Sequence, residues 1–183
     1  MAEIKVQNIV ASTKYSDKLD LDLIAQSLED TEYEPEQFPG LVFRLEKPKT
    51  ATLLFTSGKA NCTGAKTVED VRITVNIIIE KLEKIGIKVD KNPKIEIQNI
   101  VATSDLGGEL NLSVVAVSLG LENVEYEPEQ FPGLVYRLKE PKVAMLLFGS
   151  GKIVCAGAKK IEEVSLAVDK LLKELSALEL LRK

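Results

Sequence analysis

The sequence predicts an α+β protein made of two similar halves, residues 1–92 and 93–183. Three observations lead to this fold class. A set of segments occurs twice, each half changes from strand periodicity to helical periodicity along its length, and some strands are apolar on both faces. We expect two short and two long helices on one face of an antiparallel sheet of about ten strands, as is typical of this class.

An internal repeat defines the two halves. Residues 4–13 (IKVQNIVAST) return as residues 95–104 (IEIQNIVATS), and residues 33–45 (YEPEQFPGLVFRL) return as residues 126–138 (YEPEQFPGLVYRL). The offset is 91 residues for the first pair and 93 for the second. Solenoid repeats span only about 20 to 50 residues, so each half is a complete structural unit. The sequence therefore predicts a pseudo-twofold monomer.

Short strands account for much of each half. Apolar and polar residues alternate over residues 4–10, and further short runs at residues 41–45, 50–56 and 59–63 are expected to be strands. Ser57-Gly58 separates the last two runs and is typical of a tight hairpin turn.

Helical periodicity appears twice in each half. A short amphipathic helix is expected at residues 21–28, begun by a cap near Asp20, and its counterpart begins at the capping residue Asn111. Apolar residues recur at helical spacing from a capping box at Thr67 onward. They predict a long helix that ends before Gly86, with a twin over residues 160–175.

The composition argues against an enzyme and against a metal site. The chain has no histidine, which removes the commonest general base, the hydrolytic triads and most zinc chemistry, although carboxylate or lysine catalysis stays open. Cys62 and Cys155 have no neighbouring cysteine to complete a metal site. We expect two buried free thiols, no cofactor, and a cytoplasmic protein, because no membrane span or secretory signal is recognisable.

One face of the expected sheet has no cover. Ala51, Leu53 and Phe55 point to one side of their strand, yet Leu54 on the opposite side is also apolar, and residues 146–148 repeat this pattern. A second layer of structure, a dimer partner or a ligand surface could cover such a face. The sequence has no spare elements for a second layer, so it indicates an external partner.

Basic charge is concentrated on the strand regions although the chain as a whole is acidic. Residues 38–66 carry a net charge of +4 and residues 131–160 carry +5, while the whole chain has a formal charge of −4. Local charge of this kind can attract a phosphate backbone, although solvated lysines would give the same count.

The segments QNIVAT, YEPEQFPGL and LLF-x-SGK-x-x-C-x-GAK, each present twice in these or closely similar forms, resemble the core of the TATA-box-binding protein family. The resemblance covers nearly the whole chain, and the absence of a long N-terminal extension favours the archaeal type. It implies a saddle, whose curved ten-stranded sheet sits with its concave side on DNA and carries the long helices on its convex side. It also implies a general transcription initiation factor, not an enzyme, that binds the TATA box of A·T-rich promoters through the minor groove and bends it.

The resemblance assigns roles to residues of both halves. The residues that match the intercalating wedges are Phe38, Phe55, Phe131 and Phe148, with Pro39 and Pro132 beside them. Asn8 and Asn99 match central asparagines whose amides can donate to adenine N3 and thymine O2. The remaining expected minor-groove contacts are Val10, Val101, Leu53, Leu146, Thr63, Val154, Ala156 and Asn61. The expected phosphate and sugar contacts are Arg44, Arg137, Ser57 and Ser150.

Protein partners are also implied by the resemblance. Glu127, Glu129 and Gln130 match the region where the family docks transcription factor B, and RNA polymerase joins the same pre-initiation complex. A solvated charged loop would show the same residues. We expect no membrane contact and a monomer on DNA, and the apolar face leaves a homodimer open for the free protein.

Two positions depart from the family pattern. Asn61 stands where valine is common, and Ala156 stands where many members have threonine, so the first half could prefer different base steps. Two other classes remain open, a diverged saddle domain that binds proteins without DNA, and an enzyme on a duplicated scaffold. The first would be expected to lose the wedges and the asparagine pair, and the second needs a catalytic acid or lysine in an apolar pocket, which we do not find.

Overall fold

The computed structural model describes residues 3–183 and divides into two compact units. The first-repeat unit is Asn8–Gln98, and the second-repeat unit joins the N-terminal segment up to Gln7 to Asn99–Lys183. Strand β1 (Ile4–Lys14) therefore begins in the second-repeat unit and ends in the first, and β6 (Glu96–Asp105) does the reverse. The expected domain limits, residues 1–92 and 93–183, stay a prediction.

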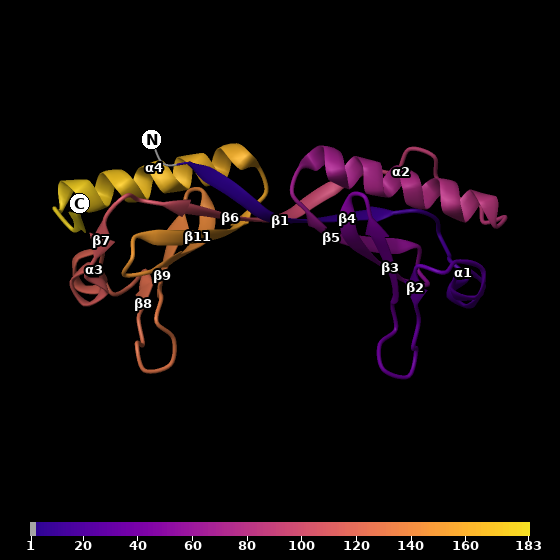
Figure 1. Cartoon of the computed structure of the whole chain (residues 1–183), viewed down its shortest axis with the longest axis horizontal. Coiled ribbons are helices and arrows are strands. Elements are labelled where there is room, and N and C mark those ends of the chain that lie inside the picture. The colour runs from indigo at the N-terminus through magenta and orange to yellow at the C-terminus, as the bar shows by residue number, and fades with distance from the viewer. Residues whose placement is uncertain (1–2) are drawn as a thin grey trace. The chain divides into compact units, whose positions relative to one another are not determined.

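The first-repeat unit has five antiparallel strands in the order β2-β3-β4-β5-β1. Figure 1 shows helix α2 lying along one face of these strands. The elements after β1 are α1 (Leu21–Ser27), β2 (Thr31–Glu32), β3 (Leu41–Glu46), β4 (Lys49–Leu54), β5 (Lys59–Ala65) and α2 (Val68–Lys84).

The second-repeat unit repeats this arrangement in the order β6-β11-β10-β9-β8, with α4 on one face (Figure 1). A further two-stranded sheet pairs β12 with β7, which the sequence did not predict. The elements after β6 are β7 (Glu109–Leu110), α3 (Leu112–Ser118), β8 (Val124–Glu125), β9 (Leu134–Lys139), β10 (Lys142–Leu147), β11 (Lys152–Ala158), α4 (Ile161–Ala177) and β12 (Leu181–Arg182). The predicted α+β class, with two repeats, ten antiparallel sheet strands, two long helices and two short ones, is confirmed.

Side-chain caps fix where the helices begin. The Asp20 carboxylate accepts a hydrogen bond from Leu23 N (3.1 Å), and the Thr67 hydroxyl accepts one from Asp70 N (3.0 Å), as expected from the sequence. Asn111 caps α3 in the same way. Helix α4 lacks a comparable hydroxyl at its start, and the Glu163 side chain instead accepts from Lys160 N at 3.1 Å. These contacts satisfy backbone donors that have no partner within the helix.

The core of each unit lies between the long helix and the strand residues that face it. In the first-repeat unit Ile9, Phe43 and Leu54 are fully buried, as are the α2 residues Ile78 and Leu82. Burial of this apolar surface is the main force that holds the helix on the sheet.

The two cysteines are also part of the cores. Cys62 and Cys155 are buried and free, which confirms the prediction of free thiols. Burial raises the pKa of both, that of Cys155 to about 11, so neither is a reactive thiolate near neutral pH. Among the described residues, no helix combines the length and the apolar character that a membrane span needs.

Candidate nucleic-acid interface

Each unit presents an open face, defined as the strand residues that point away from its long helix. They alternate with the buried residues and are themselves exposed or half-buried. In the first-repeat unit the centre of the open face is formed by Asn8, Val10, Val42, Ala51, Leu53, Asn61 and Thr63. In the second-repeat unit it is formed by Asn99, Val101, Val135, Ala144, Leu146, Val154 and Ala156.

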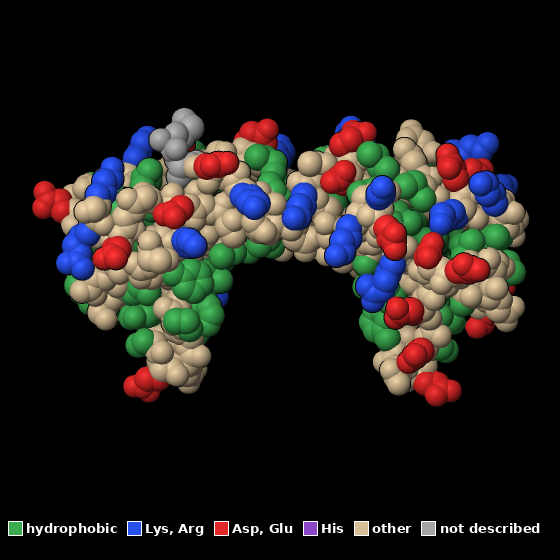
Figure 2. Space-filling model, in the orientation of Figure 1, with side chains coloured by type: hydrophobic (Ala, Val, Ile, Leu, Met, Phe, Trp, Pro, Cys, Tyr) green, Lys and Arg blue, Asp and Glu red, His purple; other side chains and the backbone are tan. Residues whose placement is uncertain are grey.

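Strand register brings these residues together on each face. Leu53 lies opposite both Val42 and Asn61, and Ala51 lies opposite Thr63. The second-repeat unit has the same pairs at the equivalent positions. Figure 2 shows hydrophobic side chains at the surface of both units, with Lys and Arg side chains beside them. These residues form a largely apolar surface, called the floor below, on each open face.

Three open-face residues were not singled out from the sequence, namely Val42, Val135 and Ala144, while Ala51 was placed on the uncovered face without a predicted contact. Their position could have been predicted, because side chains alternate along a strand with period two. Each of these residues lies two residues along its strand from a predicted minor-groove contact, or directly opposite one on the next strand.

A pair of phenylalanines stands beside each floor. The ring centroids of Phe38 and Phe55 are 6.1 Å apart at an interplanar angle of 67°, and those of Phe131 and Phe148 are 6.0 Å apart at 69°. Phe38 is 41% exposed and Phe131 is 42% exposed, which is unusual for so large an apolar side chain. Edge-to-face packing orients the rings without burying them. Pro39 follows Phe38, Pro132 follows Phe131, and both prolines are exposed.

A glycine beneath each ring pair makes this packing possible. A Cβ added to Gly40 would lie 2.7 Å from Cε2 of Phe38, and one added to Gly133 would lie 2.6 Å from Cε2 of Phe131. Both phenylalanines of a pair crowd their glycine, since Cε1 of Phe55 or of Phe148 would lie 3.0 Å away. The FPG motif therefore positions the rings as well as supplying one of them.

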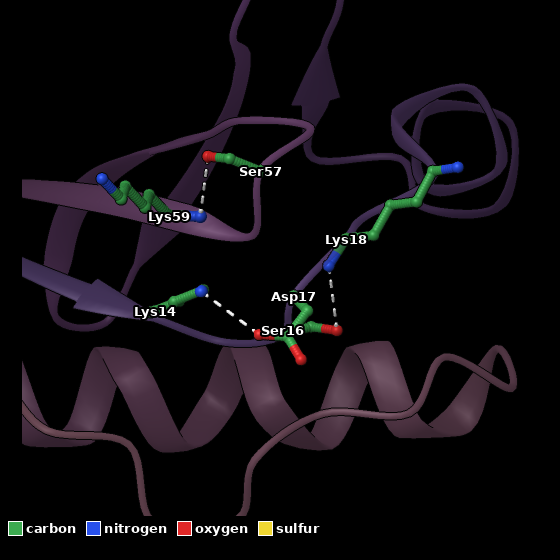
Figure 3. Close-up of polar contacts among 6 residues, drawn as sticks. All are labelled: Lys14, Ser16, Asp17, Lys18, Ser57 and Lys59. Atoms are coloured by element: carbon green, nitrogen blue, oxygen red, sulfur yellow. Dashed lines mark hydrogen bonds and ion pairs between the residues drawn. The ribbon is translucent and has the colours of Figure 1, made fainter.

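The second ring of each pair, Phe55 or Phe148, lies at the start of a tight turn and is called the inner phenylalanine below. Strand β4 ends at Leu54, earlier than the sequence predicted, and the Gly58 N–H donates to the Phe55 carbonyl oxygen at 2.9 Å. Gly58 has φ +88, and a Cβ there would lie 1.6 Å from the Ser16 carbonyl oxygen, so only glycine fits. Ser57 is exposed on this turn and accepts a hydrogen bond from Lys59 N at 3.4 Å (Figure 3).

The turn of the second-repeat unit has the same construction. Gly151 N–H donates to the Phe148 carbonyl oxygen at 2.9 Å, and Ser150 accepts from Lys152 N at 3.4 Å. Ser57 and Ser150 thus occupy equivalent exposed places next to an inner phenylalanine.

The two predicted asparagines are held in a defined orientation. The Oδ1 atom of Asn8 accepts a hydrogen bond from Gly64 N at 2.6 Å, and Oδ1 of Asn99 accepts one from Gly157 N at 2.6 Å. A backbone N–H can only donate, so the oxygen end of each amide must face the glycine. The amide NH₂ groups are therefore the ends left for contacts with another molecule.

The two asparagines differ in what they meet next. Nδ2 of Asn8 donates to the Thr63 hydroxyl at 3.1 Å. The equivalent of Thr63 is Ala156, and within residues 3–183 Nδ2 of Asn99 makes no hydrogen bond. The second-repeat asparagine therefore has both NH₂ protons available.

Arg44 and Arg137 also point to the open faces, where Arg44 lies opposite Ala51 and Arg137 lies opposite Ala144. Each is exposed on the strand next to the sheet edge and pairs with a glutamate of the edge strand, Arg44 with Glu32 at 3.3 Å and Arg137 with Glu125 at 3.5 Å. Exposed ion pairs of this kind are weak. A phosphate could therefore replace the glutamate as the partner of each guanidinium group.

The acidic residues predicted to contact a protein partner lie in the loop between β8 and β9. Glu127 accepts hydrogen bonds through its carbonyl oxygen from the N–H groups of Gln130 (2.9 Å) and Phe131 (3.0 Å), while Glu129 is exposed. The first-repeat loop has the same turn around Glu34. The geometry therefore does not distinguish the two loops.

Each unit also has a surface hollow at the inner phenylalanine. The first hollow is lined by Phe55, Ser57 and Asn61 together with Lys14, Lys59, Lys94 and Glu96. The second is lined by Phe148, Ser150 and Val154 together with Lys5, Lys152, Glu3 and Asp105. Their charged residues sum to +2 and to zero, respectively.

The net charge difference equals the reversal at one position, because the reversals at Lys94/Glu3 and at Glu96/Lys5 cancel each other. Lys14 lines the first hollow, and its equivalent in the second is Asp105. The Lys14 ammonium group pairs with Asp17 at 3.2 Å (Figure 3). The sequence analysis missed the hollows because it summed charge over whole segments and not by face. Within residues 3–183, no group of His, Cys, Asp and Glu side chains could hold a metal ion.

Comparison with known proteins gives one consistent result. Residues 3–85 and 94–178 each match the family model described as transcription factor TFIID or TATA-binding protein. The chain is 62% identical to the TATA-box-binding protein of Picrophilus torridus over 96% of its length and 95% of the relative's, and 52% identical to that of Archaeoglobus fulgidus over 98% of each. The solved structure of Methanococcus jannaschii TBP is 55% identical and superposes with a TM-score of 0.88, covering 96% of this chain and 99% of that one.

Proposed function

Because the chain belongs to the TATA-binding protein family, we propose that it binds A·T-rich promoter DNA with its open faces in the minor groove, bends the DNA, and recruits transcription factor B and RNA polymerase. Membership confirms the resemblance to the archaeal type and the prediction that the chain is not an enzyme. The groove, the bend, the contact residues and the protein partners are the proposal.

The orientation of Asn8 and Asn99 is the observation that carries it. Each amide presents NH₂ donors among apolar floor residues, because a glycine N–H occupies its oxygen. In the minor groove an A·T pair offers only the acceptors adenine N3 and thymine O2, while a G·C pair adds the guanine N2 amine, a donor. Donors on an apolar floor match the first pattern and leave the guanine amine without a partner. The expected selectivity is therefore for A·T pairs.

The phenylalanine pairs supply the bend. Apolar side chains inserted between base steps unstack them and kink the duplex away from the minor groove. Phe38 with Phe55 and Phe131 with Phe148 are exposed or half-buried, oriented by their ring contacts, and backed by proline and glycine. We assign them as the wedges at the two ends of the site.

Basic residues at the margins of the floor supply the non-specific attraction. Lys59 and Lys152 line the hollows next to Ser57 and Ser150, and these groups are assigned to phosphate and sugar. Arg44 and Arg137 would contact the backbone after leaving their exposed glutamate partners.

The acidic β8–β9 loop is assigned to the protein partner. Glu127, Glu129 and Gln130 are exposed on this loop, and their charge suits a basic surface of transcription factor B better than it suits DNA. The equivalent first-repeat loop has the same turn, so the assignment of the partner contact to the β8–β9 loop needs a test. Two charge reversals at equivalent positions, Glu129→Arg and Glu36→Arg, provide it. Loss of the ternary complex only with Glu129→Arg supports it, and equal effects contradict it.

A binding experiment with two duplexes tests the main proposal. One duplex contains a TATA element and the other has G·C pairs in its place, and both carry dyes at their ends so that energy transfer reports bending. The chain is expected to bind and bend the first duplex only, with both effects reduced by Phe148→Ala. Equal weak binding to both duplexes without bending would reject the proposal and favour a protein-interaction module.

A further inference from the structure

The two open faces differ at one position next to the inner phenylalanine. Asn61 in β5 lies opposite Leu53 and Ser12, and the equivalent residue in β11 is Val154. Val154 lies opposite Leu146 and Thr103, the equivalents of Leu53 and Ser12. The surrounding register is therefore the same in both units, and Asn61 and Val154 occupy equivalent positions in it.

The Asn61 amide is available to form hydrogen bonds with another molecule. Its side chain is exposed in the first hollow, next to Phe55 and Ser57, and within residues 3–183 it takes part in no hydrogen bond. It differs in this respect from Asn8, whose amide oxygen is held by Gly64 N–H. Asn61 can therefore present either its oxygen or its NH₂ group, whereas Val154 presents only methyl groups.

This freedom changes which base pairs the position accepts. Facing an A·T pair, the NH₂ group of Asn61 can donate to adenine N3 or thymine O2. Facing a G·C pair, the amide can rotate so that Oδ1 accepts a hydrogen bond from the guanine N2 amine. A valine at the same place would bury that amine without an acceptor, which is costly.

We propose that Asn61 makes the first-repeat face permissive for a G·C pair at the position it contacts, while Val154 keeps the second-repeat face restrictive at the equivalent position. The inference rests on the proposed minor-groove function and refines its specificity. It predicts a recognition site that is A·T-only at one end and accepts either pair at the other, although the two repeats share the same fold and strand register.

The test measures dissociation constants for duplexes in which a G·C pair replaces an A·T pair at each position in turn, and at the two members of each mirror-related pair of positions together. A protein with two similar halves can bind in either orientation, so each constant reports the better one. For the wild-type chain, one pair of mirror positions should tolerate a single G·C substitution on either side. The double substitution there should weaken binding about three- to tenfold more, the value of one lost hydrogen bond.

Two reciprocal variants make the assignment. Asn61→Val should raise the penalty for that single substitution about three- to tenfold, because both faces then reject the guanine amine. Val154→Asn should reduce the penalty for the double substitution by a similar factor. The fold has asparagine at this position in the first repeat and valine in the second, so it is compatible with either side chain. Thermal unfolding of each variant confirms that it is folded.

The outcomes separate the inference from the function on which it rests. Unchanged G·C penalties in Asn61→Val, with A·T-selective binding retained, would overturn the inference alone. An unaltered double-substitution penalty in Val154→Asn would likewise overturn it. If the wild-type chain bound an all-G·C duplex as well as a TATA duplex, the proposed function would fail and the inference with it.

Discussion

Asn8 donates to the Thr63 hydroxyl at 3.1 Å, while the residue equivalent to Thr63 in the second repeat is Ala156, which offers Asn99 no hydroxyl. Both asparagines keep the same glycine contact through Oδ1. The threonine hydroxyl can donate as well as accept, and its oxygen also lies 3.3 Å from Oδ1 of Asn8. One change to both asparagines should therefore have unequal effects.

Aspartate substitution tests whether the amide NH₂ groups face the bases. In Asn99→Asp one carboxylate oxygen can still accept from Gly157 N–H, but the other now faces the adenine and thymine acceptors and repels them. We expect binding to a TATA duplex to weaken by at least about tenfold, equivalent to ~1.4 kcal/mol. Asn8→Asp should lose less, because Thr63 can donate to the new carboxylate. Fluorescence anisotropy measures both constants, and equal losses, or none, would contradict the assigned orientation.

Gly133→Ala tests the role of the glycine beneath the rings. The new methyl group would lie 2.6 Å from Phe131 and 3.0 Å from Phe148, so the ring pair must move while the core stays intact. We expect bending by energy transfer to fall, and affinity to fall about tenfold. Gly149→Ala is the matched control, since its nearest atom would be Leu110 O at 3.6 Å. If both variants bent DNA like the wild type, the glycine would have no positioning role.

The repeat and its periodicity were sufficient to predict the helices and the longer strands. Caps at Asp20, Asn111 and Thr67 were readable because a short polar side chain before an apolar helical pattern has one common structural use. The β12-β7 pair was not predicted, because Leu181–Arg182 is too short to show periodicity, and its pairing depends on a chain reversal after α4.

The site was predictable in its residues and less so in its interactions. The alternation of strand residues places Val10, Leu53 and Thr63 on one face. Whether an amide presents oxygen or NH₂ depends on a contact 56 residues away in the chain, from Gly64 N–H to Asn8. The crowding of Gly40 by Phe38 and Phe55 similarly requires tertiary coordinates. Sequence patterns predict which face of a strand a residue lies on and whether it is buried. The hydrogen-bond partner of a given polar atom depends on how the folded chain packs.

Tyr136 gives the second-repeat unit a pH dependence in the alkaline range. Burial, and then the hydrogen bond and negative charge of Glu174 at 2.9 Å, raise its pKa to about 12. The folded protein therefore keeps this proton more tightly than the unfolded chain, whose tyrosine titrates at about 10. The resulting stabilisation is fully present below pH ~10 and is lost as the pH rises through ~12.

Urea unfolding at a series of pH values measures this effect. The free energy of unfolding should fall from pH 10 to 12 more steeply in the wild type than in Tyr136→Phe, which resembles Phe43 at the equivalent position. Glu174→Gln removes the carboxylate charge, which should lower the pKa of Tyr136 in the folded protein, so that the fall becomes smaller and ends at a lower pH. Identical slopes for the wild type and Tyr136→Phe would show that this tyrosine makes no contribution.

The unequal charge of the two hollows predicts an unequal response to salt. Asp105→Lys would give the second hollow the lysine that Lys14 provides in the first, next to the proposed phosphate contact of Ser150. One added phosphate contact should strengthen binding and steepen the slope of log K against log salt concentration by about 0.9. Glu83→Lys makes the same change of charge on the exposed surface of α2, away from either hollow, and controls for net charge. A slope change as large in Glu83→Lys as in Asp105→Lys would mean that overall charge, and not a phosphate at the second hollow, is responsible.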